Sequence, residues 1–397
     1  MLHEHKRLLR ATLLVAGTTI GGGMLALPVL TSPGGFIPAL VMYVLCWAIM
    51  VCTGLLALEA YLWMDGDPNL ISMAEKTLGR WGKVYTWCLY IFLFYCLTLA
   101  YTVGCGKLVV DFLDGSIDHW MGNLIFIGIF FPLVFAGARL IGRLNTPLMA
   151  GLIFFYCAFV ILGLPYVRVE NLTRVDWLQS LKAMPVAFTA FGFHGIIPTL
   201  GRYLHKDANH ARTAIVIGSL IPLLCYVIWE WLILGIVPTE GPGGLLEAIS
   251  KDMTAVEPLK AVIQNPLIYT VGQFFAFFAL VTSFLGVTLG LRDFLADGLT
   301  IEKDVKGRFV ICLLIFLPVL LLSFSNPAIF LKALDYGGGL GAALLLGLLP
   351  IMMVWSGRYY HKFPQQSVAL RGGRAILVIL ISLITVELVI EAIHLMG

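Results

Sequence analysis

The sequence predicts an all-α integral membrane protein of eleven transmembrane helices, arranged as two inverted repeats of five helices plus one extra helix. Of its 397 residues, 59% are hydrophobic and 12% are charged, whereas soluble domains carry roughly 25% charged residues. Long apolar runs recur along the chain. Two of them, five runs apart, are interrupted by glycine and proline near their middle. These three observations carry the prediction.

Each apolar run is long enough to cross a bilayer as a helix, because a hydrocarbon core of about 30 Å needs roughly 20 apolar residues. Long continuous runs favour helices over the short alternating strands of a β-barrel. The predicted helices cover residues 9–30, 36–63, 83–112, 121–138, 146–166, 183–201, 212–237, 265–296, 308–324, 328–355 and 374–395. We expect one transmembrane domain over 1–395. Its first repeat is 9–166, its second repeat is 183–355, and 374–395 is an additional helix 11.

Two of the linkers are longer than the rest. The stretch from Asp65 to Gly82 predicts a surface helix capped near Asn69. The stretch from Thr239 to Pro266 is rich in glycine and proline and then amphipathic. It is either a lid or hinge loop or a passive connector.

The distribution of basic residues predicts the orientation in the membrane. Most of the 26 lysines and arginines fall in the N-terminus and in alternate linkers, and such basic segments stay in the cytoplasm. With eleven helices, the N-terminus is then cytoplasmic and the C-terminus periplasmic. The net charge of +3 and the lack of a basic cluster with interleaved aromatics exclude a nucleic-acid partner. The eight cysteines lie in apolar segments without a C-x-x-C pair and are expected to be packing residues.

The first interrupted helix contains VAGTTIGGGMLALP, residues 15–28, and the sixth contains PVAFTAFGFHGIIPTL, residues 185–200. Such paired interruptions are typical of inverted-repeat transporters. A break frees backbone N–H and C=O groups that a continuous helix uses itself. The half-helix that resumes after it favours a carboxylate at its N-terminus. The alternative is that the glycines mediate tight helix packing and the prolines only kink the helices.

Four segments together resemble the bacterial hydroxy/aromatic amino acid permeases. They are VAGTTIGGGMLALP, FTAFGFHGIIPTL, ALVTSFLGVTLGLRDFLADG (residues 279–298) and RGGRAILV (residues 371–378). The resemblance covers essentially the whole chain, in order and with matching spacing. It implies a leucine-transporter fold with broken helices 1 and 6, in a bacterial inner membrane. It also implies import of an aromatic amino acid, tyrosine first, with a coupling ion that is usually a proton.

Carried over by motif, the resemblance implies a substrate site at the two breaks. Gly17 to Gly23 would be unwound, and the N–H groups of Gly21, Gly22 and Gly23 would hold the substrate carboxylate. Carbonyls at Ala190 and Phe191 would accept from the substrate ammonium. The remaining candidates are Thr18, Thr19, Phe193, His194 and Val287, together with Tyr95 and Tyr101 of helix 3, one of which is expected to contact substrate.

The coupling ion is either sodium or a proton. Sodium-coupled relatives of this fold imply a candidate sodium site at Gly17, Ile20, Ala279, Thr282 and Ser283. The alternative is that Thr282 and Ser283 bond back to their own helix. His194 and Glu230 are the candidates for carrying a proton. Glu387 could also carry a proton, but it lies in the additional helix, away from the expected site. Asp335 precedes three glycines in helix 10 and is either a gate residue or the end of a helix that meets a close neighbour.

The expected function is secondary active import by alternating access, with tryptophan or another neutral amino acid as the alternative substrate. A transport-inactive amino acid sensor of the same fold is a second alternative. An intramembrane enzyme is not expected, because the sequence has no H-E-x-x-H, no G-x-S-x-G and no clustered carboxylates. We expect no cofactor beyond the ion. The expected partners are the substrate and the lipid bilayer, with no obligatory protein partner.

Overall fold

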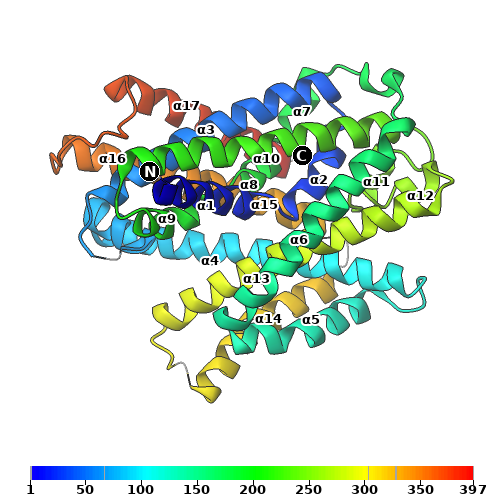
Figure 1. Ribbon diagram of the computed structural model, residues 1–397, viewed down its shortest axis with the longest axis horizontal. Helices are drawn as coiled ribbons and strands as arrows, with labels where there is room; N and C mark the ends of the chain where they lie inside the picture. The colour runs from blue at the N-terminus through cyan, green and yellow to red at the C-terminus, as the bar shows by residue number, and fades with distance from the viewer. Residues whose placement is uncertain (1, 67, 303, 327–328, 397) are drawn as a thin grey trace.

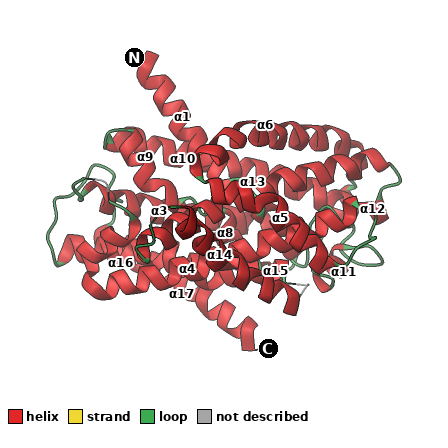
Figure 2. Cartoon of the chain, turned by 90° about the horizontal axis from the view of Figure 1, so that it is seen from below, coloured by secondary structure: helices red, strands yellow, loops and turns green. Residues whose placement is uncertain are grey.

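A computed structural model describes residues 2–66, 68–302, 304–326 and 329–396. Within these ranges the chain is helical, and no strand occurs (Figures 1 and 2). Ten helices are long and apolar enough to cross a membrane. An eleventh span is the bent pair Glu4–Thr19 and Gly23–Thr31, whose halves meet at 56°. The described residues therefore confirm the predicted eleven spans.

The element bounds agree with the predicted runs to within a few residues at most ends. The structure contains α1 (Leu2–Thr19), α2 (Gly23–Thr31), α3 (Phe36–Leu62), α4 (Leu70–Phe112), α5 (His119–Ala136), α6 (Ala138–Gly163), η1 (Leu164–Tyr166), η2 (Val169–Leu172), α7 (Trp177–Leu181), α8 (Met184–Ala190), η3 (His194–Ile196), α9 (Ile197–Tyr203), α10 (Ala208–Ile236), α11 (Leu245–Ser250), α12 (Leu259–Val262), α13 (Pro266–Gly298), α14 (Val305–Ser325), α15 (Phe330–Tyr336), η4 (Gly337–Leu348), α16 (Leu349–Tyr359) and α17 (Gly373–Met396). The repeat boundaries at 9–166 and 183–355 stay a prediction.

Both predicted breaks are present. The first lies at Ile20–Gly22, between α1 and α2, and the second at Phe191–Phe193, between α8 and η3. The half-helix α1 projects from the body of the molecule at the N-terminal end (Figure 2). Each break leaves backbone groups without partners in their own helix, so it needs partners from neighbouring elements.

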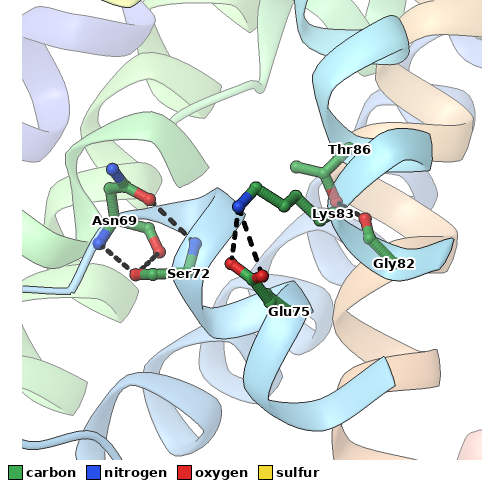
Figure 3. A network of polar contacts seen from close by, with 6 residues as sticks. All are labelled: Asn69, Ser72, Glu75, Gly82, Lys83 and Thr86. Carbon is green, nitrogen blue, oxygen red and sulfur yellow. Dashed lines mark hydrogen bonds and ion pairs between the residues drawn. The ribbon is translucent and has the colours of Figure 1, made fainter. Parts of the chain in front are cut away.

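The predicted surface helix is real and forms the first part of α4. Asn69 caps it, accepting from the Ser72 N–H at 2.9 Å while its own N–H donates to Ser72 Oγ at 2.9 Å. A kink at Gly79, where φ is +71°, then turns the chain into the membrane span. Because of this kink, Lys83 reaches back to Glu75 at 3.0 Å, as Figure 3 shows.

Several helices at the edge of the molecule face outward with apolar side chains. Ile129 on α5, Phe154 on α6 and Leu321 on α14 are each at least 60% exposed. In Figure 1, α5 and α14 lie along one side of the molecule. Exposed apolar surface of this extent on long apolar helices is the surface that lipid covers.

The stretch between α10 and α13 is held to the core at several points. The Ala255 N–H donates to the Leu25 carbonyl of α2 at 2.9 Å. Asp252 forms a buried ion pair with Lys107 of α4, Nζ to Oδ2 2.7 Å, and accepts from the N–H groups of Phe330 and Leu331 at 2.9 and 2.7 Å. The loop thus joins α2, α4 and α15 on the side opposite the N-terminus. Burial also raises the pKa of Glu257 in this loop.

The tenth span changes helix type part-way. After α15 the stretch Gly337–Leu348 is wound as a π-helix, and α16 then continues to Tyr359. A side chain at Gly338 would collide with the Pro185 carbonyl of α8, so this glycine lets the wide helix pack directly on the broken sixth span. The additional helix α17 packs against the same π-helix.

Candidate functional site

The two breaks lie against each other in the middle of the molecule. A Cβ added at Gly23, the first residue of α2, would lie 3.3 Å from the Ala190 Cα at the end of α8. Three helix ends therefore meet here: the C-terminus of α1, the N-terminus of α2 and the C-terminus of α8. Backbone acceptors from two helix C-termini and backbone donors from one helix N-terminus are brought together there.

Tyr226 of α10 joins the ends of the two interrupted helices. Its hydroxyl lies 2.7 Å from the Thr19 carbonyl of α1 and 2.9 Å from the Ala190 carbonyl of α8. A phenol has one proton and can donate to only one of these oxygens at a time. Two buried acceptors therefore converge on one donor. An ammonium group, with three donors, satisfies both.

Tyr226 was not among the site residues predicted from the sequence. Nothing in the sequence distinguishes it from other tyrosines in apolar helices, since its role depends on which way α10 is rotated. Its partners stand 207 and 36 positions away along the chain. The Ala190 carbonyl itself was among the expected ligands, and the structure places it at the junction.

The predicted carboxylate donors lie opposite α13 and α4. The Gly22 N–H donates to Ser283 Oγ of α13 at 2.8 Å. A Cβ at Gly22 would lie 2.7 Å from Cε1 of Tyr101 and 2.9 Å from Cδ2 of Leu280. Tyr95 and Tyr101 both lie on α4, the third membrane span. Of the two, Tyr101 is the one whose ring packs against Gly22 in the break.

The predicted sodium ligands are only partly assembled. Ser283 lies against the break, where it accepts from Gly22 rather than bonding to its own helix. The Thr282 hydroxyl instead bonds back to its own helix, at 2.8 Å from the Phe278 carbonyl and 3.2 Å from the Ala279 carbonyl. Gly17 lies within α1, and Ile20 lies in the break. The expectation that Gly17 to Gly23 is unwound was therefore too wide, because α1 continues to Thr19 and α2 begins at Gly23. The assignment of these groups to sodium stays a prediction.

Two phenylalanines of the second break are buried in aromatic surroundings. Phe191 packs between Tyr43 and Tyr226, with ring centroids 6.3 and 5.2 Å away. Phe193 stacks on His194 at 5.0 Å, and its ring fills the space beside Gly54 of α3. Both rings are 1% exposed. They can form apolar walls next to the junction, as expected for an aromatic side chain.

His194 faces α3. Its Nε2 lies 3.0 Å from Thr53 Oγ1, while its buried Nδ1 finds no hydrogen-bond partner among the described residues. The ring is 1% exposed. A histidine nitrogen left without a partner inside the protein is available for a substrate hydroxyl, a water or a proton.

Glu230 lies one helical turn beyond Tyr226 on α10, is fully buried and accepts two hydrogen bonds. The Thr31 hydroxyl of α2 donates to Oε1 at 2.5 Å, and the Tyr43 hydroxyl of α3 donates to Oε2 at 2.6 Å. Because Tyr43 also contacts Phe191, this carboxyl is linked through one side chain to the second break.

Four other candidate side chains make no polar contact at the junction among the described residues. The Tyr95 hydroxyl donates to the Leu314 carbonyl of α14 at 2.7 Å. The exposed Thr18 hydroxyl donates to Leu14 of its own helix at 2.8 Å, and the buried Thr19 hydroxyl likewise bonds to Val15 at 2.9 Å. Val287 is half-buried one turn beyond Ser283. Thr19 takes part through its carbonyl rather than through its side chain.

Comparison with known proteins places the chain among amino acid permeases. The sequence model of the tryptophan/tyrosine permease family matches residues 4–391. Tyrosine-specific transport system 1 of Haemophilus influenzae is 34% identical, with 88% of each chain covered. The tryptophan-specific transport protein of the same organism is 31% identical, covering 92% of this chain and 91% of the relative. Low affinity tryptophan permease of Escherichia coli is 29% identical over 93% of this chain and 91% of its own length.

A solved structure resembles the whole fold. A manganese transporter of Eremococcus coleocola superposes with a TM-score of 0.59 at 15% identity, covering 97% of this chain and 85% of the other. At this identity the likeness concerns the fold alone. Together with the paired breaks, it confirms the expected fold class, an eleven-helix leucine-transporter fold. The relatives are named as transport proteins and permeases, not as enzymes.

Proposed function

The chain belongs to the tryptophan/tyrosine permease family, and from this premise we propose that it is a symporter importing an aromatic amino acid, tyrosine first. The proposal also places it in a bacterial inner membrane, with a cytoplasmic N-terminus and a periplasmic C-terminus. The observation that carries it is the junction of the two breaks, where the Thr19 and Ala190 carbonyls converge on one point.

An amino acid matches the polar groups of this junction. Its ammonium would donate to the Thr19 and Ala190 carbonyls in place of the Tyr226 hydroxyl. Its carboxylate would take the N–H groups at Gly21 to Gly23, where α2 begins and the helix dipole favours negative charge. Phe191 and Phe193 would line the side-chain pocket, and His194 would meet the phenol hydroxyl. Binding favours one set of conformations only through its differential affinity for them.

Uptake into proteoliposomes tests this function. Labelled tyrosine, tryptophan, phenylalanine, serine and a branched-chain amino acid are compared under separate sodium and proton gradients. We expect concentrative uptake of an aromatic amino acid, driven by one gradient. Binding of tyrosine without flux would identify a sensor instead. Binding of no amino acid would contradict both functions.

The Tyr226 hydroxyl gives a first prediction. Tyr226→Phe leaves the Thr19 and Ala190 carbonyls without this donor in the empty protein, while the bound ammonium still satisfies them. A net hydrogen bond is worth about 1 kcal/mol, so tyrosine should bind about fivefold more tightly and the empty protein should unfold at a lower temperature. Equilibrium binding and thermal unfolding in detergent measure both.

The matched control is Tyr156→Phe. It removes a hydroxyl that donates to the Cys225 carbonyl at 2.9 Å rather than to the Thr19 or Ala190 carbonyl, and is expected to leave tyrosine affinity unchanged. Weaker binding by Tyr226→Phe would mean that the hydroxyl stays in place as a substrate contact, and that the ammonium does not displace it.

The coupling ion gives a second prediction. If sodium drives uptake, Thr282→Ala should lower uptake and its sodium dependence together, because one of five neutral oxygen ligands is lost. The control is Thr288→Ala on the same helix, whose buried hydroxyl bonds to the Phe284 carbonyl at 2.6 Å. Unchanged sodium dependence in Thr282→Ala would remove the sodium site. If protons drive uptake, His194→Gln or Glu230→Gln should flatten its pH dependence.

A further inference from the structure

A second set of ionisable side chains lies apart from the two breaks, on the additional helix α17. Glu387 and Glu391 are four residues apart and so share one face of that helix. Both are 0% exposed. All four of their carboxylate oxygens are buried and have no hydrogen-bond partner among the described residues. Buried polar atoms are nearly always paired, so this arrangement indicates a missing partner.

A third carboxyl lies near this pair. Asp335 of α15 interacts electrostatically with both Glu387 and Glu391. Asp335 lies near the start of the tenth span, and Glu391 near the end of α17. Both are therefore close to the side opposite the N-terminus. The three carboxyls stand 52 and 56 residues apart along the chain, and the fold brings them near enough for their charges to interact.

The other charged and titratable groups on the neighbouring elements are few. The Cys46 thiol of α3 interacts with Glu387, and neither α8 nor η4 contains a titratable residue. On α16, Arg358 is paired with Glu59 at 2.5 Å. Arg358 and Tyr359 lie at the end of the tenth span, whereas Asp335 lies near its start. On α15, Lys332 and Tyr336 are exposed. His394 follows Glu391 by three residues, with a side chain outside the described part.

The π-helix makes room for the Glu391 carboxyl. A Cβ at Gly339 would lie 2.6 Å from Glu391 Cδ, so only a glycine allows this approach. The neighbouring Gly338 packs on Pro185 of α8. The Thr189 hydroxyl of α8 also lies 3.4 Å from the Leu334 carbonyl of α15. The segment that faces the carboxyls is therefore in direct contact with the broken sixth span.

Protons are the ligand that this chemistry favours. An ionised carboxylate without a counter-ion inside a membrane protein costs several kcal/mol, and like charges side by side add to that cost. A proton removes the charge and supplies a hydrogen-bond donor. Within the described part of the chain these carboxyls are not close enough together to share a metal ion.

We propose that Asp335, Glu387 and Glu391 form a proton-binding site near the periplasmic side, from which protons drive import. The role of this site in transport rests on the proposed function. Its protonation does not depend on that function. Proton binding neutralises the cluster and favours the packing of the π-helix on α17. Because the same π-helix contacts α8, the state of the cluster is linked to the second break.

Infrared difference spectroscopy of the purified full-length protein tests protonation without transport. Shifting the pH between about 5 and 9, the range in which buried carboxyls titrate, should change the C=O stretch of protonated carboxyls. We expect Glu387→Gln with Glu391→Gln to remove a large part of this signal. If the double variant does not fold, the two single variants are measured instead, and each should lose part of the same C=O band. A spectrum identical to that of the unaltered protein would overturn the proposal.

Transport measurements separate this site from the function itself. In the double variant, accumulation of tyrosine under a proton gradient should fall at least tenfold, while tyrosine binding and gradient-independent exchange persist. The control is Glu240→Gln, which alters an exposed carboxyl paired with Arg174. Full proton-driven accumulation in the double variant would overturn the site alone. Absence of all transport in the unaltered protein would overturn the proposed function and leave the infrared result to decide the site.

Discussion

Replacing Gly22 by alanine is expected to reduce tyrosine uptake at least tenfold. The new methyl group would lie 2.7 Å from Tyr101 Cε1 and 2.9 Å from Leu280 Cδ2, distances at which one of the neighbours must move. Overpacking a well-filled interior costs about 1–3 kcal/mol. If the backbone at residue 22 shifts to relieve this overlap, its N–H moves away from the Ser283 hydroxyl. Initial rates of labelled tyrosine uptake, normalised to the amount of folded protein, measure the effect.

Gly128→Ala is the matched control. Gly128 lies within α5, and a Cβ there meets nothing within 4 Å, so this variant should transport normally and gain slightly in helix stability. If Gly22→Ala transported as well as Gly128→Ala, close approach at the first break would not be needed. The assignment of this backbone to the substrate carboxylate would then lose its main support.

Asp252→Asn is expected to destabilise the protein by about 3–5 kcal/mol, the usual cost of breaking a buried ion pair by removing one partner. Lys107 is 8% exposed and would keep its charge without the carboxylate that pairs with it directly. The same carboxylate also accepts from the N–H groups of Phe330 and Leu331. Its loss should therefore loosen the loop from α4 and α15 together and reduce uptake. Thermal unfolding in detergent and tyrosine uptake measure the two effects.

An exposed ion pair formed by the same stretch between α10 and α13 serves as the comparison. Arg174 and Glu240 also lie 2.7 Å apart, but the Glu240 side chain is 71% exposed, so Glu240→Gln should cost no more than about 1 kcal/mol. Combining Asp252→Asn with Lys107→Met should recover part of the lost stability, because the unpaired lysine charge is removed, although Glu257 then loses a nearby positive charge. Equal destabilisation by Asp252→Asn and Glu240→Gln would contradict a structural role for the buried pair.

Features that depend on neighbouring residues were predictable from the sequence. The lengths of the apolar runs predicted the eleven spans, and glycines and prolines predicted the two breaks. The Asn69 cap was predicted from the polar residues before an apolar segment and is confirmed by its reciprocal bonds with Ser72. Each of these properties is decided within a few residues of chain, by helix length, backbone freedom or capping.

Rotation of each helix about its axis was not predictable. In a membrane both the lipid-facing and the protein-facing sides of a helix are apolar, so no hydrophobic stripe indicates which side turns inward. For this reason Tyr95 and Tyr101 were equivalent in the sequence, yet only Tyr101 contacts the break while Tyr95 bonds to α14. Tyr226 went unnoticed for the same reason.

The sequence by itself thus determined the fold class, the number of spans and the two places where backbone is exposed for a substrate. Only the tertiary structure decided what surrounds those places. It brought Tyr226 to the ends of two helices, turned Ser283 toward the break, and placed Asp335 near Glu387 and Glu391. The physical reason is that each of these arrangements joins residues from different helices, and their meeting depends on helix packing rather than on local sequence.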